Sequence, residues 1–288
     1  MIWTFIALIS AFSVSIADFL TKKYLSTTSV WVVYWVRIGY AVPFLLITGK
    51  LFPFPNLPAE FWMIMIPLVI LETCAGILYA RAIQISPLSL TIPFMAFTPV
   101  FLLGVGYIIL GEVPSLMGTS GVVMVAAGAY LLNIHHTKYG ILAPVKAVFK
   151  EKGSWMMLTV ALLYSFSSSF GKKALSFTDP LFYSTFYMTL VAVIDLPVMF
   201  ALTGYRPRLF FKKPAVYLMV GLAMAGMNLT HFIAVGHMNV AYMIAIKRMN
   251  LLFSILWGYW FFGEERIAQN ILACIMMIGG VIIISFSR

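Results

Sequence analysis

The sequence predicts an all-α membrane protein in which ten transmembrane helices form two five-helix repeats of inverted topology. Three observations lead to this prediction. Of the 288 residues, 62% are hydrophobic and 10% are charged, and the mean hydropathy is +0.99, which excludes an ordinary soluble domain. Apolar runs of about 20 residues, the length that crosses a bilayer, recur from end to end. The second half of the chain also repeats the first.

Clusters of turn-forming residues divide the chain into ten apolar spans. Because the hydrocarbon core holds no water to satisfy the backbone, each span is expected to be a helix. The first span follows no basic segment and has no A-x-A cleavage site, so it is expected to be a retained helix and not a signal peptide. We place the spans at 2–21, 28–49, 60–83, 87–110, 116–134, 154–172, 181–203, 214–236, 240–262 and 267–286.

An internal repeat supports this division. Sliding the sequence by 152 residues places Gly106 on Gly258 and Glu112 on Glu264. Each half holds five spans, an odd number, so the two halves are expected to cross the membrane in opposite directions. Inverted repeats build transporters that bind substrate near the membrane midplane. The predicted units are a first repeat at 1–137, a basic linker at 138–153 and a second repeat at 154–288.

Two segments at matching places in the repeats carry a family resemblance: SPLSLTIPFMAFTPVFLLGVGYIILGE and AIKRMNLLFSILWGYWFFGEE. With ten spans in duplicated halves, the whole chain resembles the drug/metabolite transporter superfamily, EamA type. The resemblance implies an exporter or exchanger that works by alternating access, with the fifth and tenth helices packed together away from the cavity. The Lys247-Arg248 pair also resembles the triose-phosphate translocator branch, in which such a pair holds a phosphate. Substrates vary widely within the superfamily, so the fold names no ligand.

The formal net charge of +10 lies mostly between the spans, where Lys and Arg set topology and contact lipid headgroups. This distribution indicates a lipid bilayer, and not nucleic acid, as the partner of the basic residues. Twelve Lys and Arg fall on the side opposite the termini and four on the side of the termini. The positive-inside rule therefore places both termini outside the cell (inner) membrane, whereas the resemblance implies both inside.

Lys247 and Arg248 are the most informative residues because a cation at bilayer depth costs a few kcal/mol and normally faces a partner or a wet cavity. On one continuous helix, Lys247, Asn250 and Ser254 share a face. Neighbours lie about 100° apart, so one cation is expected to line the cavity while the other pairs inward. They are candidates to hold a phosphate or carboxylate. The alternative is a buried ion pair with Glu72 or Asp195.

A second polar face in the third span holds Glu72 and Tyr79. Glu72 is a candidate proton-coupling site, and the alternative is a static partner for Arg37 or Lys247. Arg37 and Tyr34, three residues apart in the second span, are candidates for the same cavity, with a structural or gating ion pair as the alternative for Arg37.

In the eighth span, Asn228 and His231 lie three residues apart on one face, and His231 falls on Tyr79 under the 152-residue shift. Equivalent polar rings in the two repeats indicate cavity lining. The alternative is hydrogen bonding between helices.

Further residues are predicted to have gating or structural roles: Asp18, Asp195, Pro93, Pro99, Glu112 and Glu264. Asp18 is expected to pair locally with Lys22, four residues on, and no partner is assigned to Asp195. The two prolines free backbone carbonyls and allow the fourth span to bend. The two glutamates end helices and are expected to pack or gate there.

These features favour a secondary transporter of a small organic metabolite that carries an acidic group, with protons or a counter-substrate as coupling partners. The sequence lacks a Walker motif, HExxH and GxSxG. We therefore expect that the protein is not an enzyme and has no catalytic residues, metal-binding residues or cofactor. We expect it to be a monomer or a homodimer. The alternatives are an integral membrane enzyme that uses His231 or Glu72 on a lipid-linked or small polar substrate, and a membrane scaffold without transport.

Overall fold

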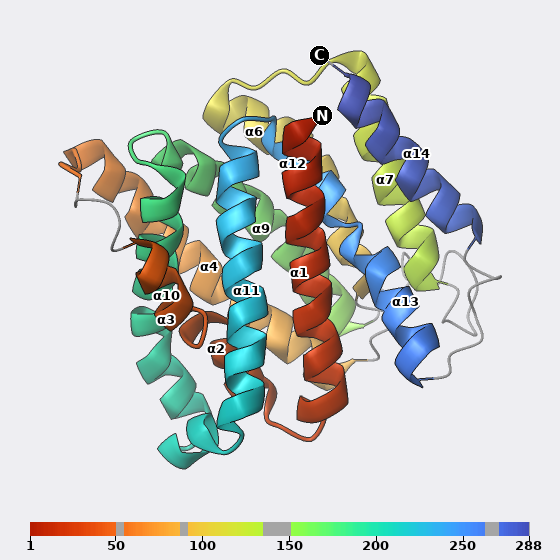
Figure 1. Ribbon diagram of the computed structural model, residues 1–288. Helices are drawn as coiled ribbons and strands as arrows, with labels where there is room; N and C mark the ends of the chain where they lie inside the picture. Colours follow the sequence, from red (N-terminus) through yellow and green to blue (C-terminus); the bar gives the residue numbers. More distant parts are fainter. Residues whose placement is uncertain (50–54, 87–91, 135–150, 263–270, 288) are drawn as a thin grey trace.

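The computed structural model describes residues 1–49, 55–86, 92–134, 151–262 and 271–287. Every regular element in these ranges is helical (Figure 1). In chain order the elements are α1 (Ile2–Leu25), α2 (Val30–Gly39), α3 (Val42–Gly49), α4 (Ala59–Ile85), η1 (Ile92–Phe97), α6 (Thr98–Leu110), α7 (Leu116–Ile134), α9 (Lys152–Leu175), α10 (Pro180–Leu202), η2 (Pro207–Phe211), α11 (Pro214–Val235), α12 (Val240–Lys247), α13 (Asn250–Phe262) and α14 (Ile271–Phe286).

These elements confirm the predicted fold class and supply a helix for each of the ten expected spans. Seven spans are long and apolar enough to cross a membrane, and α7 and α14 are shorter apolar helices. The remaining span, the sixth in chain order, is α9, which has 24 residues. It is more polar than the others because it carries the serine-rich run Ser165–Ser169.

Three of the spans are broken within the bundle. The second span divides into α2 and α3, the fourth into η1 and α6, and the ninth into α12 and α13. Under the 152-residue shift, the break in the ninth span falls on the break in the fourth. The prediction of one continuous helix that carries Lys247, Asn250 and Ser254 on one face is therefore wrong.

Helices of one repeat pack against helices of the other. Apart from the pairing of α7 with α14, the most extensive contacts join α1 to α11 and α4 to α9, and α1 and α11 run side by side in Figure 1. The repeat relation converts one pair into the other, since α1 corresponds to α9 and α4 to α11. The Ser10 hydroxyl donates to the Met227 carbonyl at 3.0 Å across the first pair. In the second pair, the Gly153 N–H donates to the Ser86 hydroxyl at 3.2 Å.

The fifth and tenth spans, α7 and α14, pack along each other at one side of the bundle (Figure 1). Gly121 and Gly280 meet at their backbones, and a Cβ on either glycine would overlap the carbonyl oxygen of the other. Close packing of this kind needs small residues. The arrangement agrees with the expectation from the family resemblance.

Both termini lie at the same end of the bundle (Figure 1), which we call the terminal end. Because consecutive spans alternate in direction, the turn between α1 and α2 lies at the other end, which we call the opposite end. The two halves therefore run in opposite directions, as the odd number of helices in each repeat predicts. Glu264 lies outside the described residues.

Candidate functional site

A cavity of about 890 Å³ lies between the two repeats. Residues of α1, α2, α4, α9, α10, α11 and α12 line it, together with the η1–α6 segment. Its wall includes Ser26 and Thr28, in the turn between α1 and α2, so the cavity reaches the opposite end of the bundle. No residue of α7 or α14 lines it.

Eight of the ten residues predicted to bind substrate line this one cavity, although they come from four helices that are far apart in the sequence. The eight are Tyr34, Arg37, Glu72, Tyr79, Asn228, His231, Lys247 and Arg248. The other two, Asn250 and Ser254, are not among the lining residues. They lie in α13, beyond the break in the ninth span.

Lys247 and Arg248 both line the cavity at the end of α12, so the expectation that one of them would pair inward is wrong. Neither side chain forms a hydrogen bond or an ion pair with a residue that the structure describes. The Arg248 Nε is buried without a partner. Glu72 and Asp18 are the carboxylates close enough to interact electrostatically with Lys247. The alternative of a buried ion pair with Glu72 or Asp195 is therefore not what the geometry shows.

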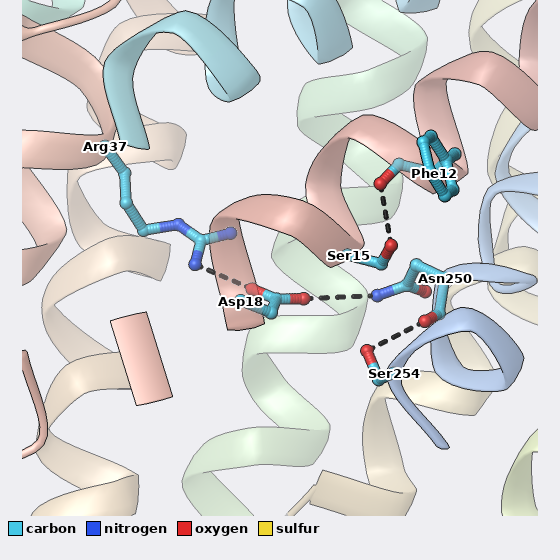
Figure 2. Close-up of polar contacts among 6 residues, drawn as sticks. All are labelled: Phe12, Ser15, Asp18, Arg37, Asn250 and Ser254. Atoms are coloured by element: carbon cyan, nitrogen blue, oxygen red, sulfur yellow. Dashed lines mark hydrogen bonds and ion pairs between the residues drawn. The ribbon is translucent and has the colours of Figure 1, made fainter. Parts of the chain in front are cut away.

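Arg37 and Asp18 form an ion pair with 2.7 Å between Nη1 and Oδ1 (Figure 2). Asn250 donates through Nδ2 to the other Asp18 oxygen at 3.5 Å, and the Ser254 hydroxyl donates to the Asn250 carbonyl at 2.8 Å. Asp18 thus pairs across helices, whereas the sequence predicted the local partner Lys22. This network ties α1 and α2 of the first repeat to α13 of the second.

Glu72 faces the cavity from the middle of α4. Its Oε2 accepts a hydrogen bond of 2.8 Å from the Ser167 hydroxyl, and Tyr187 interacts with the same carboxylate. Among the described residues, Glu72 has no ion-pair partner. The alternative in which Glu72 pairs with Arg37 or Lys247 is therefore not observed.

Asp195, to which the sequence assigned no partner, is completely buried in α10. Its two oxygens accept hydrogen bonds from the Tyr34 hydroxyl at 2.9 Å and from the Thr73 hydroxyl at 2.6 Å. Asp195 is not among the cavity-lining residues. It joins α2 and α4 of the first repeat to α10 of the second.

Asn228 and His231 line the cavity from α11. The Asn228 Oδ1 is buried without a hydrogen-bond partner. The His231 Nδ1 lies 3.0 Å from the Met243 Sδ, and its ring packs edge-on against Phe232 with 4.9 Å between centroids. His231 therefore makes the interhelical contact that was the alternative to cavity lining, and it lines the cavity as well. Asn228 makes no interhelical hydrogen bond within the part of the chain that the structure describes.

The terminal end of the cavity is closed by contacts between the repeats, which we call the terminal seal. Glu112, just beyond the end of α6, forms an ion pair with Lys172 of α9. The same carboxylate accepts from the Val240 N–H at 2.9 Å, and Lys172 donates to the Met238 carbonyl at 2.5 Å. Gly171, the neighbour of Lys172, lines the cavity, so the seal lies directly beside it.

The prolines of the fourth span lie at its break. Pro93 is buried within η1, and Pro99 occupies the first turn of α6. A proline is favourable there because the first helical N–H groups have no partner inside the helix. The fourth span therefore changes from a 3₁₀ helix to an α-helix between the two prolines, and neither proline lines the cavity.

Sequence reasoning missed Ser167, Ser168 and Gly171 of α9. Tyr164, Ser167, Ser168 and Gly171 all line the cavity, and their spacing of i, i+3, i+4 and i+7 marks one face of a helix. That spacing was visible in the sequence and leads directly to Lys172. Tyr187 of α10, which also lines the cavity, has no such signal.

Comparisons with known proteins give one family and one fold. The family described as "EamA-like transporter family" matches the chain twice, at residues 1–134 and 151–286. A solved structure described as "Crystal structure of protein" superposes with a TM-score of 0.79 at 12% sequence identity, covering 98% of this chain and 96% of that one. At that identity the likeness shows the fold alone. A comparison with curated proteins found no match.

Proposed function

Since the chain belongs to the EamA-like transporter family, we propose that it is a secondary transporter that moves a small organic metabolite with an acidic group by alternating access. Family membership itself indicates an integral membrane protein that transports small molecules. The acidic group, and the residues that hold it, are the proposal.

The observation that carries the proposal is the pair of partnerless cations. Lys247 and Arg248 line the cavity, and no described carboxylate pairs with either of them. Desolvated cations are costly unless a partner compensates them. Arg37, in contrast, is already satisfied by Asp18. An incoming phosphate or carboxylate supplies the missing partner through charge-assisted hydrogen bonds.

The remainder of the cavity wall suits the rest of a small metabolite. Tyrosine rings from four helices surround the space and offer apolar faces with polar edges. Asn228 and His231 add hydrogen-bonding groups from α11. The tyrosines are Tyr34, Tyr79, Tyr164 and Tyr187.

The proposal predicts that Lys247→Ala and Arg248→Ala each weaken binding of the acidic substrate by about 10- to 100-fold, because each removes a charge-assisted hydrogen bond worth roughly 1.5–3 kcal/mol. A thermal-shift screen of purified protein against phosphorylated sugars, organic acids, amino acids and nucleosides identifies the substrate. Titration of each variant with that substrate then measures the loss.

Lys173→Ala is the matched control, since Lys173 is exposed at the terminal end and does not line the cavity. It removes one positive charge from the protein and is expected to bind as the wild type does. Unchanged binding in both cavity variants would remove the anion site. Product formation without solute accumulation in proteoliposomes would instead favour the membrane enzyme.

We place the protein in the cell (inner) membrane with both termini outside, because the basic residues concentrate at the opposite end. In that orientation the cavity opens toward the cytoplasm. The family resemblance implies the reverse. A reporter fused to the C-terminus decides between them: we expect activity from one that works outside the cytoplasm, and activity from one that works only in the cytoplasm would overturn this orientation.

A further inference from the structure

Glu72 differs from the other described carboxylates of the bundle interior. Asp18 is paired with Arg37, Glu112 is paired with Lys172, and both oxygens of Asp195 accept hydrogen bonds from hydroxyl groups. Glu72 lines the cavity without an ion pair among the described residues, and its neighbours there are the hydroxyl groups of Ser167, which donates to it, and Tyr187.

The groups around Glu72 come from every helix packed against it. Lys247 of α12 is the cation that interacts with it, and Asp195 of α10 is the second carboxylate in range. The remaining neighbours are hydroxyl groups on α2, α9 and α10. They are Tyr34, Tyr164, Ser167, Tyr183 and Tyr187.

The charges in the cavity therefore change when an anion enters. In the empty cavity, burial opposes the ionised form of Glu72, whereas the nearby positive charge of Lys247 favours it, since an opposite charge stabilises an ionised carboxyl group. An anion bound to Lys247 and Arg248 neutralises those cations and adds a negative charge beside Glu72. Like charges repel strongly where little water screens them, so the carboxylate then takes up a proton.

We propose that Glu72 is a proton-binding site linked to the anion site, so that an acidic substrate and a proton are carried together. The inference rests on the proposed function. The proton comes from the water of the cavity, binds a carboxylate oxygen of Glu72, and leaves to water on the far side when the substrate dissociates. A monovalent anion then crosses without net charge.

The linkage works in both directions, because two ligands that bind one protein change each other's affinity by the same factor. Substrate binding therefore takes up a proton, and the anion binds more tightly as the pH falls through the range in which Glu72 titrates. Asp195 is less suited to this role because it does not line the cavity and both its oxygens are occupied.

The test uses purified protein and two probes that carry no titratable proton near neutral pH, sulfate and ethanesulfonate. Calorimetric titration in buffers of different ionisation enthalpy counts the protons taken up for each anion bound. For the wild type we expect proton uptake, and a rise in affinity of about tenfold from the alkaline to the acidic side of neutrality, a typical coupling between sites.

Glu72→Gln mimics the protonated side chain. It is expected to bind the probes at least as tightly as the wild type, with no proton uptake and no dependence of affinity on pH over the same range. Asp195→Asn makes the same carboxyl-to-amide change outside the cavity and is expected to keep the uptake. Uptake that persists in Glu72→Gln, or that is lost in Asp195→Asn alone, would overturn the assignment to Glu72.

Ser167→Ala provides a second variant that leaves Glu72 in place. It removes the hydroxyl that donates to the carboxylate, a contact that favours the ionised form. The pH of maximal uptake should therefore move upward, and an unchanged profile would contradict the proposal. Anion binding without proton uptake by the wild type overturns the coupling alone, whereas no binding of either probe overturns the proposed function as well.

Discussion

At the scale of single residues, the interior of the bundle contains polar groups of two kinds. Asp195 and Asp18 have their partners within the protein, and those partners lie on helices of the other repeat or of another span. Lys247 and Arg248 have no partners among the described residues. The satisfied groups join helices to one another, and the unsatisfied groups at the cavity wall are those that we propose to bind the anion.

The network around Asp195 leads to a prediction about stability. Tyr34→Phe removes the hydroxyl that donates to Asp195 Oδ2 at 2.9 Å, and it leaves that buried oxygen without a donor among the described residues. We expect the free energy of unfolding to fall by about 1–3 kcal/mol, the cost of an unsatisfied buried polar group. Thermal or denaturant unfolding in detergent measures the change.

Tyr79→Phe is the matched control for this prediction. Tyr79 also lines the cavity, but its hydroxyl makes no hydrogen bond to any residue that the structure describes. Its removal is expected to leave the stability of the protein within about 0.5 kcal/mol of the wild type. Equal stability of the two variants would show that the hydrogen bond from Tyr34 to Asp195 contributes nothing measurable.

At the scale of helices, one of the breaks within the spans could be predicted from the sequence and another could not. The break between η1 and α6 could be predicted because Pro93 and Pro99 flank it. The equivalent break between α12 and α13 contains neither proline nor glycine from Lys247 to Asn250. Its cause is visible in the backbone: the N–H groups of Met249, Leu251 and Leu252 bond to carbonyls three residues back, and this tighter 3₁₀ winding rotates the chain.

The same contrast holds for the candidate site. Helical spacing within one span correctly grouped Tyr34 with Arg37 and Asn228 with His231, since those pairs lie inside unbroken helices. Spacing failed for Asn250 and Ser254 because the break comes between them and Lys247. Contacts between repeats, such as that of Glu112 with Lys172, depend on packing across the bundle, and no local pattern encodes the partner.

At the scale of the whole molecule, the sequence is more symmetric than the structure. The helix pairs of the two repeats correspond to each other, yet the cavity reaches the opposite end and is closed at the terminal end. With a gap of two residues in the 152-residue shift, Lys172 of the terminal seal corresponds to Lys22, and Lys22 lines the cavity. Inverted repeats that adopt different arrangements produce one open and one closed end, which is the structural basis of alternating access.

Loss of the seal should therefore open the terminal end more often. After replacement of Cys74 and Cys274, Ser168→Cys places a thiol on the cavity wall, about one helical turn before Lys172. In that background we expect Glu112→Gln to increase labelling from the terminal side, by a membrane-impermeant thiol reagent, by about fivefold. That increase corresponds to the loss of roughly 1 kcal/mol from a partly exposed ion pair.

Asp179→Asn is the control for the loss of one negative charge at the terminal end. Asp179 lies at the same end and caps α10 by accepting from the Leu181 N–H at 2.7 Å, but it takes no part in the seal. This variant should leave labelling from the terminal side unchanged, whereas Lys172→Gln should increase it as Glu112→Gln does. If neither seal variant alters the rate, the barrier at this end is the packing of the surrounding helices. Packed side chains separate only when the helices that carry them move together. That result would therefore mean that the terminal end opens and closes by a rearrangement of whole helices.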